Sequence, residues 1–146
     1  MKNKKIITFI LIIAWMILLF CFSNQNREQS SEVSEKVTEI TSRTLNIQIE
    51  KQGQKLETKI RKLTHCGLYT IGGILILTHI NLYDISLKKK ILLTQIIGTS
   101  YAIFDEYHQT FVMGRSGEIL DVLIDLLGVL TGLLIVILLL KIRKKE

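Results

Sequence analysis

Two long stretches without a charged residue constrain this chain more than any other feature. Residues 6–22 and 63–83 contain no Asp, Glu, Lys or Arg. A helix needs about 20 mostly apolar residues to cross roughly 30 Å of hydrocarbon, so each stretch is suited to a membrane span. Two shorter runs, 91–104 and 126–140, reach that length only if their helices include polar residues beside them. A composition that is 48% hydrophobic, without proline, also favours a membrane protein.

The fold predicted from these runs is all-α, a polytopic membrane protein in which residues 1–146 form a single domain. The four expected transmembrane helices span residues 6–22, 63–83, 91–111 and 119–140. Between the first two lies a polar outer segment, residues 23–62, with apolar residues at helical spacing from Val33 to Thr44 and a hinge near Gly53. We expect a short surface helix there and assign it no chemistry.

The lysines gather at the ends of the apolar runs. Lys2–Lys5, Lys88–Lys90 and Lys141–Lys145 contain about half of the 19 basic residues, and four spans would place all three clusters on one side. The positive-inside rule makes that side, and both termini, cytoplasmic in a plasma-membrane protein. Arg61 and Lys62 lie on the opposite side and weaken this argument. Membrane flanks explain the net charge of +6 better than nucleic-acid binding does.

The first 22 residues resemble a signal peptide, but no small-residue cleavage site follows them, so we expect a retained anchor. Bulky Phe20 before Cys21 argues against lipoprotein processing. A disulfide between Cys21 and Cys66 is one alternative, and two separate packed thiols is the simpler one.

Polar residues and glycines recur at helical spacing within two of the expected spans. On the second helix the stripe is His65, Tyr69, Gly72, Ile76 and His79. On the fourth it is Asp121, Asp125, Gly128 and Gly132. Because polar groups avoid lipid, both stripes are expected to face the bundle, and the glycines of the fourth helix favour close helix packing.

The end of the third helix adds Asp105, Glu106, His108 and Gln109, and the first helix ends in Ser23 and Gln25. In the predicted topology all of these groups except His79 lie toward the outer ends of their helices. We therefore expect one polar site that faces outward.

The chemistry of this site stays open at the level of sequence. His108 with Asp105 or Glu106 suits general acid–base catalysis, while Arg115 suits binding of a phosphate or carboxylate. Asp121 and Asp125 could instead form a structural ion pair with Arg115. Several residues are plausible metal ligands, but none has the spacing of a zinc signature, so we expect no metal and no cofactor.

The chain resembles the VanZ-like family of bacterial membrane proteins along most of its length. The resemblance rests on FSNQ at 22–25, RKLTHCGLY at 61–69, YAIFDEYHQTFVMGR at 101–115 and DVLIDLLGVLTG at 121–132. Two positions depart from the family pattern: Met113 stands where proline is favoured, and Leu68 stands where an acid is common.

The resemblance implies a cytoplasmic-membrane protein, and the founding member of the family is associated with reduced teicoplanin susceptibility. It implies no particular reaction. Our leading hypothesis is an envelope protein whose outward site binds a cell-wall or lipid-linked ligand. The alternatives are a membrane-embedded hydrolase or transferase, and a structural or partner-docking protein. No oligomeric state follows from the sequence.

Overall fold

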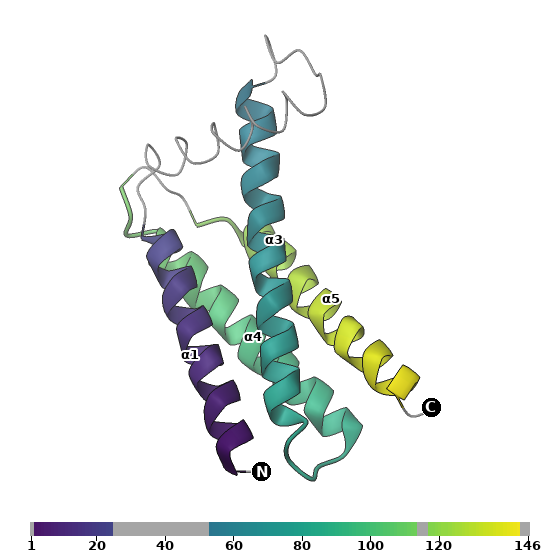
Figure 1. Ribbon diagram of the computed structural model, residues 1–146. Coiled ribbons are helices and arrows are strands. Elements are labelled where there is room, and N and C mark those ends of the chain that lie inside the picture. Colours follow the sequence, from purple (N-terminus) through teal and green to yellow (C-terminus); the bar gives the residue numbers. More distant parts are fainter. Residues whose placement is uncertain (1, 25–52, 114–116, 144–146) are drawn as a thin grey trace.

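Four helices make up the part of the chain that the computed structural model describes, which is residues 2–24, 53–113 and 117–143 (Figure 1). They are α1 (Lys2–Ser23), α3 (Gly53–Ile80), α4 (Leu87–Gln109) and α5 (Ile119–Arg143). The described residues contain no strand, which confirms the all-α prediction. The expected surface helix near residues 33–44 lies outside these ranges.

Three of the helices are long and apolar enough to cross a membrane: Lys2–Ser23, Lys59–Ile80 and Ile119–Ile142. They correspond to the first, second and fourth predicted spans. The third, α4, is of similar length, but Lys88–Lys90 and two acidic residues interrupt its apolar character. Large apolar side chains are exposed along all four helices, as expected for surfaces that face lipid.

Helices α3 and α4 begin earlier than predicted, because each continues through the charged residues beside its apolar run. α3 begins at Gly53 rather than at residue 63, and α4 begins at Leu87 rather than at 91. Lys, Glu, Gln and Leu have high helix propensity, and neither proline nor glycine interrupts residues 54–62. Charge therefore marks where the hydrocarbon ends, while the helix continues. At the other end α4 stops at Gln109, and the next residues form a turn.

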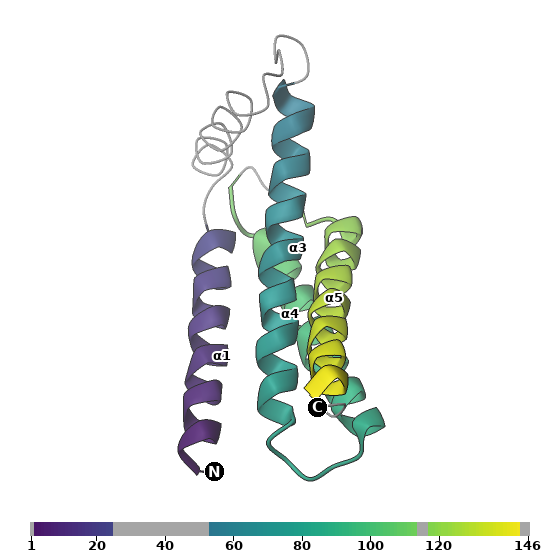
Figure 2. The ribbon, with the colours of Figure 1, turned by 45° about the vertical axis from the view of Figure 1, so that its right-hand side comes forward.

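α3 contacts each of the other three helices and packs most extensively against α5 (Figure 2). The contact depends on glycine, because a Cβ at Gly128 would collide with the carbonyl oxygen of Cys66, and one at Gly132 with that of Thr70. From the opposite side, a Cβ at Gly73 would collide with the backbone of Val129. Small residues thus allow the two backbones to approach closely, as in other membrane helix pairs.

α1 is attached through the only tryptophan. Trp15 packs against Gly72, and its indole N–H donates a hydrogen bond of 2.9 Å to the carbonyl oxygen of Leu68 on α3. Tyr101 of α4 donates its hydroxyl hydrogen to the carbonyl oxygen of Met16. These bonds satisfy two aromatic polar groups that would otherwise be buried without partners, and they connect α1 to both neighbours.

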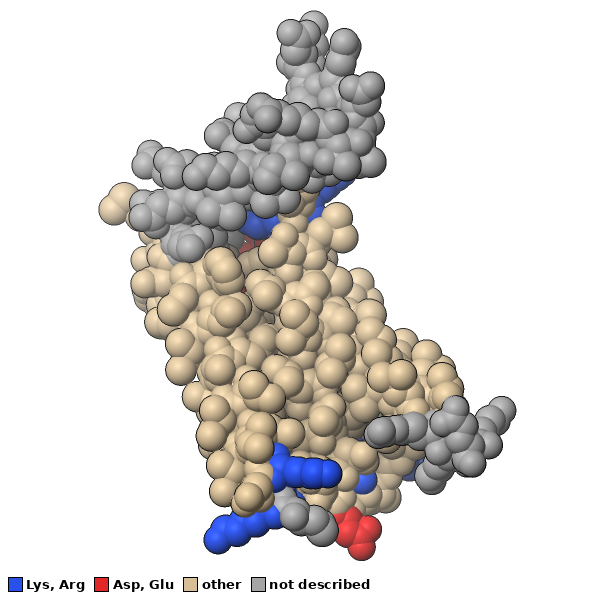
Figure 3. Space-filling model, in the orientation of Figure 1, with Lys and Arg blue, Asp and Glu red and all other residues tan. Residues whose placement is uncertain are grey.

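The end of the bundle that carries both termini is basic (Figures 1 and 3). Here Lys5 lies over the ring of Tyr83, 4.0 Å from its centroid, and Nζ of Lys90 donates to the side-chain oxygen of Asn81 at 2.8 Å. His79 also lies here, with its Nδ1 2.7 Å from the hydroxyl of Thr8. It is therefore a packing residue, separate from the polar groups at the opposite end.

Candidate functional site

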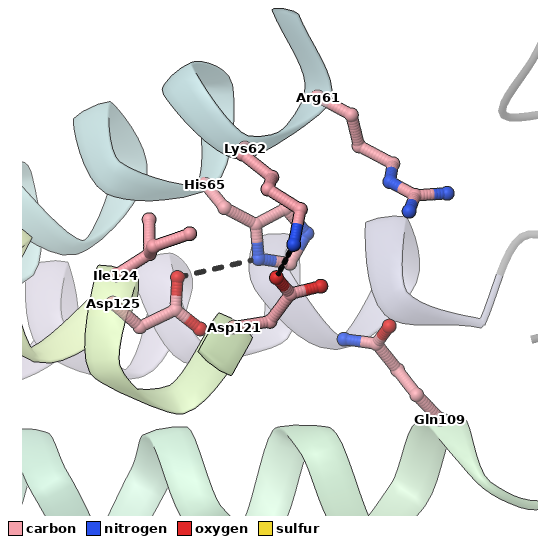
Figure 4. A pocket seen from close by; sticks show the side chains of 7 residues that line it. All are labelled: Arg61, Lys62, His65, Gln109, Asp121, Ile124 and Asp125. Atoms are coloured by element: carbon pink, nitrogen blue, oxygen red, sulfur yellow. Dashed lines mark hydrogen bonds and ion pairs between the residues drawn. The ribbon is translucent and has the colours of Figure 1, made fainter. Parts of the chain in front are cut away.

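A small pocket opens at the end of the bundle opposite the termini, where α3, α4 and α5 meet. Its lining residues are Arg61, Lys62, His65, Gln109, Asp121, Ile124 and Asp125 (Figure 4). The free space within it is about 10 Å³, roughly what one water molecule or one ion needs. Lys62 and His65 of α3 point toward Asp121 and Asp125 of α5 across this space, and Gln109 approaches from α4.

The deepest part of the site joins α3 to α5. Nδ1 of His65 lies 3.5 Å from Oδ1 of Asp125, and the Asp125 side chain is completely buried. Asp105 of α4, only 1% exposed, completes a group of three residues. Each offers one side-chain nitrogen or oxygen atom, and these three atoms lie within 4.8 Å of one another. Three helices therefore bring an imidazole and two carboxyl groups together.

Hydrogen bonds from one amide side chain organise the α4 acids. Nε2 of Gln109 donates to Asp105 Oδ2 at 3.3 Å and to Glu106 Oε1 at 3.1 Å. The second oxygen of Glu106 accepts a hydrogen bond of 2.9 Å from the backbone N–H of Glu118. This N–H immediately precedes α5, where a carboxylate is stabilised by the unpaired N–H groups and the dipole of the helix.

Lys62 provides a cation at the rim of the pocket. Its ammonium donates to Oδ1 of Asp121 and lies 3.3 Å from Oε2 of Glu118. The Lys62 side chain is 25% exposed, so solvent partly screens this ion pair. It offsets one of these two negative charges and links the start of α5 to α3.

Several buried polar atoms have no hydrogen-bond partner among the described residues. They include the hydroxyls of Ser23 and Tyr69, Oδ1 of Asp105 and Oδ2 of Asp125. Tyr69 is fully buried within electrostatic range of both aspartates, and its ring lies edge-on to Trp15. Each such group carries a desolvation cost, and a ligand that bonds to it would reduce that cost.

His108 lies apart from the pocket lining. Its ring stacks on Phe20 of α1 with centroids 4.6 Å apart, and its Nε2 is buried without a partner among the described residues. The described residues show no hydrogen bond from His108 to Asp105 or Glu106. An acid–base pair containing His108 therefore has no geometric support here.

A comparison with protein-family models matches residues 8–140 to VanZ/LLP1. The chain belongs to the VanZ/LLP1 family. All of the described site residues lie inside the matched range. No curated protein and no solved structure matches the chain.

The structure of this VanZ/LLP1 chain brings together most of the site residues that the sequence indicated. His65, Tyr69, Asp105, Gln109 and Asp125 converge, as do Glu106 and Asp121. Ser23 is buried at the end of α1. Gln25 and Arg115 lie outside the described residues, so the proposed pairing of Arg115 with Asp121 or Asp125 does too.

Lys62 is not among the site residues that the sequence indicates, although the structure places it in the pocket. Its position three residues before His65 continues the polar stripe of α3 and would have indicated this. Cys21 is exposed and Cys66 half-buried, and both are free thiols.

Proposed function

We propose that this VanZ/LLP1 protein crosses the plasma membrane four times and uses its polar pocket, on the outer face, to bind a cell-wall or lipid-linked ligand, thereby lowering teicoplanin susceptibility. The surrounding bilayer is its first partner, and nucleic acid is not one. Support comes from the family, from the three apolar helices and from the burial of the polar cluster.

α4 is proposed as the fourth span. Its 23 residues extend about 34 Å, enough to cross the hydrocarbon. Its charged residues lie near its two ends, and its middle exposes Leu92, Ile96, Ile97 and Ile103. Asp105 and Glu106 are buried among other helices rather than exposed, which makes their position near lipid tolerable.

The orientation follows from charge. Lys2–Lys5, the start of α4 and Lys141 belong to the end that carries both termini, while the pocket lies at the other end. The positive-inside rule assigns the basic end to the cytoplasm. The pocket then faces the exterior, where cell-wall precursors are assembled into peptidoglycan.

The observation that carries the proposal is the pair of buried aspartates with unpartnered oxygens. A purely structural ion pair would satisfy its carboxylates, as Lys62 does for Asp121. Asp105 is 1% exposed and Asp125 is completely buried, yet each keeps an oxygen without a hydrogen-bond partner among the described residues. Such groups are costly in a membrane bundle, and a binding role explains why they are there.

Susceptibility of a sensitive Gram-positive host tests this function. Cells express the wild type, Asp105→Asn or the matched control Asp84→Asn, which alters an exposed acid at the opposite end of the bundle. Membrane levels are equalised by immunoblot. We expect the wild type and Asp84→Asn to raise the inhibitory concentration of teicoplanin and Asp105→Asn to lose the effect. No protection by the wild type would overturn the glycopeptide role.

A second candidate function is hydrolysis or group transfer on a lipid-linked envelope substrate. It is favoured by the unpartnered oxygens of Asp105 and Asp125, because a carboxylate that lines a pocket, as Asp125 does, can accept a proton from a nucleophile. Expression of the wild type should then change the profile of lipid-linked precursors. Expression of Asp125→Asn at equal abundance should leave the profile as it is in cells without the protein. An unchanged profile with the wild type would exclude this candidate.

A further inference from the structure

We propose that His65, Asp105 and Asp125 bind one divalent transition-metal ion of the Zn²⁺ or Mn²⁺ class. The three residues come from α3, α4 and α5, and their candidate ligand atoms all lie within 4.8 Å of one another. Metal–ligand bonds of about 2.0–2.2 Å hold three ligand atoms in tetrahedral or trigonal geometry about 3.3–3.8 Å from one another. Side-chain movements on the order of 1 Å would therefore close the three residues around an ion.

The ligand types select this class of metal. One imidazole with two carboxylates is a mixed nitrogen and oxygen set that suits Zn²⁺ and Mn²⁺, whereas Mg²⁺ and Ca²⁺ prefer oxygen ligands alone. The sequence lacks a zinc signature because the three ligands lie on different helices, with Asp105 forty residues after His65. A search for short spacings, such as two histidines one turn apart, does not detect a site of this kind.

The unpartnered oxygens point to a ligand independently of the clustering. Oδ2 of Asp125 and Oδ1 of Asp105 are buried without a hydrogen-bond partner among the described residues. The other oxygen of Asp105 accepts a hydrogen bond from Gln109, an arrangement by which outer-shell groups commonly orient a metal-binding carboxylate. The nearby hydroxyl of Tyr69, also unpartnered, offers a further oxygen.

Charge balance also favours a divalent cation. Lys62 is engaged with Asp121 and Glu118 at the rim, so it does not neutralise the inner aspartates. A protonated His65 would balance one of them. A divalent ion would balance both while His65 binds through a neutral nitrogen. Its route to the site is the adjoining pocket, which His65 and Asp125 also line.

This site goes beyond the proposed function, because metal binding can be measured without any envelope ligand. If that function also holds, the ion would supply a positive charge at the base of the pocket and attract an anionic ligand. The two ideas can therefore fail separately: metal binding with no effect on glycopeptides, or protection without a metal.

The test measures metal content and binding in protein purified in detergent without a histidine tag. After treatment with a chelator, the wild type is dialysed against Zn²⁺ or Mn²⁺, and bound metal is counted by mass spectrometry. We expect one equivalent of metal and a rise in unfolding temperature. His65→Ala should lose the bound metal, whereas His79→Ala, which alters a histidine at the opposite end of the bundle, should retain it.

Asp125→Asn and Asp105→Asn should weaken binding by more than the roughly 10–100-fold that loss of an outer-shell partner costs. Asp84→Asn, which alters an exposed acid at the opposite end of the bundle, should not.

A measurement on the wild type alone keeps the proposal testable if a variant fails to fold. Co²⁺ should give visible absorption bands that Zn²⁺ abolishes with a stoichiometry of one. If the wild type binds neither Zn²⁺ nor Mn²⁺, or if His65→Ala binds as much metal as the wild type, the proposal is overturned. A protonated His65 paired with Asp125 would then be the balancing cation.

Discussion

His65 and Asp125 face each other across 3.5 Å beside a close backbone contact between α3 and α5. Gly128, one turn after Asp125, lies against the backbone of Cys66, the residue that follows His65. Backbone contact thus fixes the spacing of the two helices that carry the imidazole and the carboxylate. Functional groups held by rigid elements are suited to selective binding.

Glycine packing between α3 and α5 gives the first prediction. Gly132→Ala introduces a Cβ against the backbone of Thr70 and Ile74, neither of which can move aside as a side-chain end would. Overpacking of this kind costs about 1–3 kcal/mol, so the unfolding temperature in detergent should fall. Gly67→Ala is the matched control, because no atom lies within 4 Å of the added Cβ there. Equal stability of the two variants would contradict the packing.

The attachment of α1 gives the second prediction. Trp15→Phe removes the N–H that bonds to Leu68, and Tyr101→Phe removes the hydroxyl that bonds to Met16. Each should lower the free energy of unfolding by about 0.5–1.5 kcal/mol, the usual net value of such a bond. The two rings lie 5.3 Å apart, so the double variant should deviate from additivity. Tyr107→Phe, at an exposed tyrosine, should have no effect.

The rim ion pair gives the third prediction. Lys62→Glu places a third acid beside Asp121 and Glu118 and should reduce the yield of folded protein. The swap Lys62→Glu with Asp121→Lys should restore part of it, with a coupling energy of about 0.5–3 kcal/mol in a double-mutant cycle. High salt should reduce that coupling because the pair is partly exposed. Additive effects would show that the contact contributes nothing.

Sidedness gives the fourth prediction. In a Cys21→Ser, Cys66→Ser background, a cysteine placed at exposed Glu118 should react with a membrane-impermeant maleimide added to intact cells. A cysteine at exposed Ser86, near the basic end, should react only after the cells are opened. The reverse pattern would place the pocket in the cytoplasm and exclude an extracellular ligand.

Much of the fold could be predicted because uncharged runs and helical stripes follow directly from the cost of burying charge in lipid. The start of α3 could not, since lysine and glutamate end a hydrophobic run without ending a helix. Lys62 was missed for the same reason: a basic residue beside a span resembles a flank until its partners on α5 are known.

The α4 residues show the limit most clearly. Successive residues turn by about 100° around a helix, so Glu106 points away from Asp105, whereas His108, three residues on, lies within about 60° of it. Which neighbour each would meet depends on the packing of the whole bundle. Glu106 meets the start of α5, whereas His108 meets Phe20 of α1, and no local pattern distinguishes these outcomes.

The length of α3 determines the depth at which a ligand would be met. Its 28 residues extend about 42 Å, longer than the roughly 30 Å hydrocarbon layer. Measured from Ile80 at the basic end, His65 lies about 23 Å along the helix and Lys62 about 27 Å. With Ile80 at one boundary of that layer, His65 and Lys62 lie about 7 Å and about 3 Å inside the other boundary, so the pocket sits just beneath the headgroups. A molecule anchored by a lipid tail could present its polar head there by diffusing sideways, without leaving the bilayer.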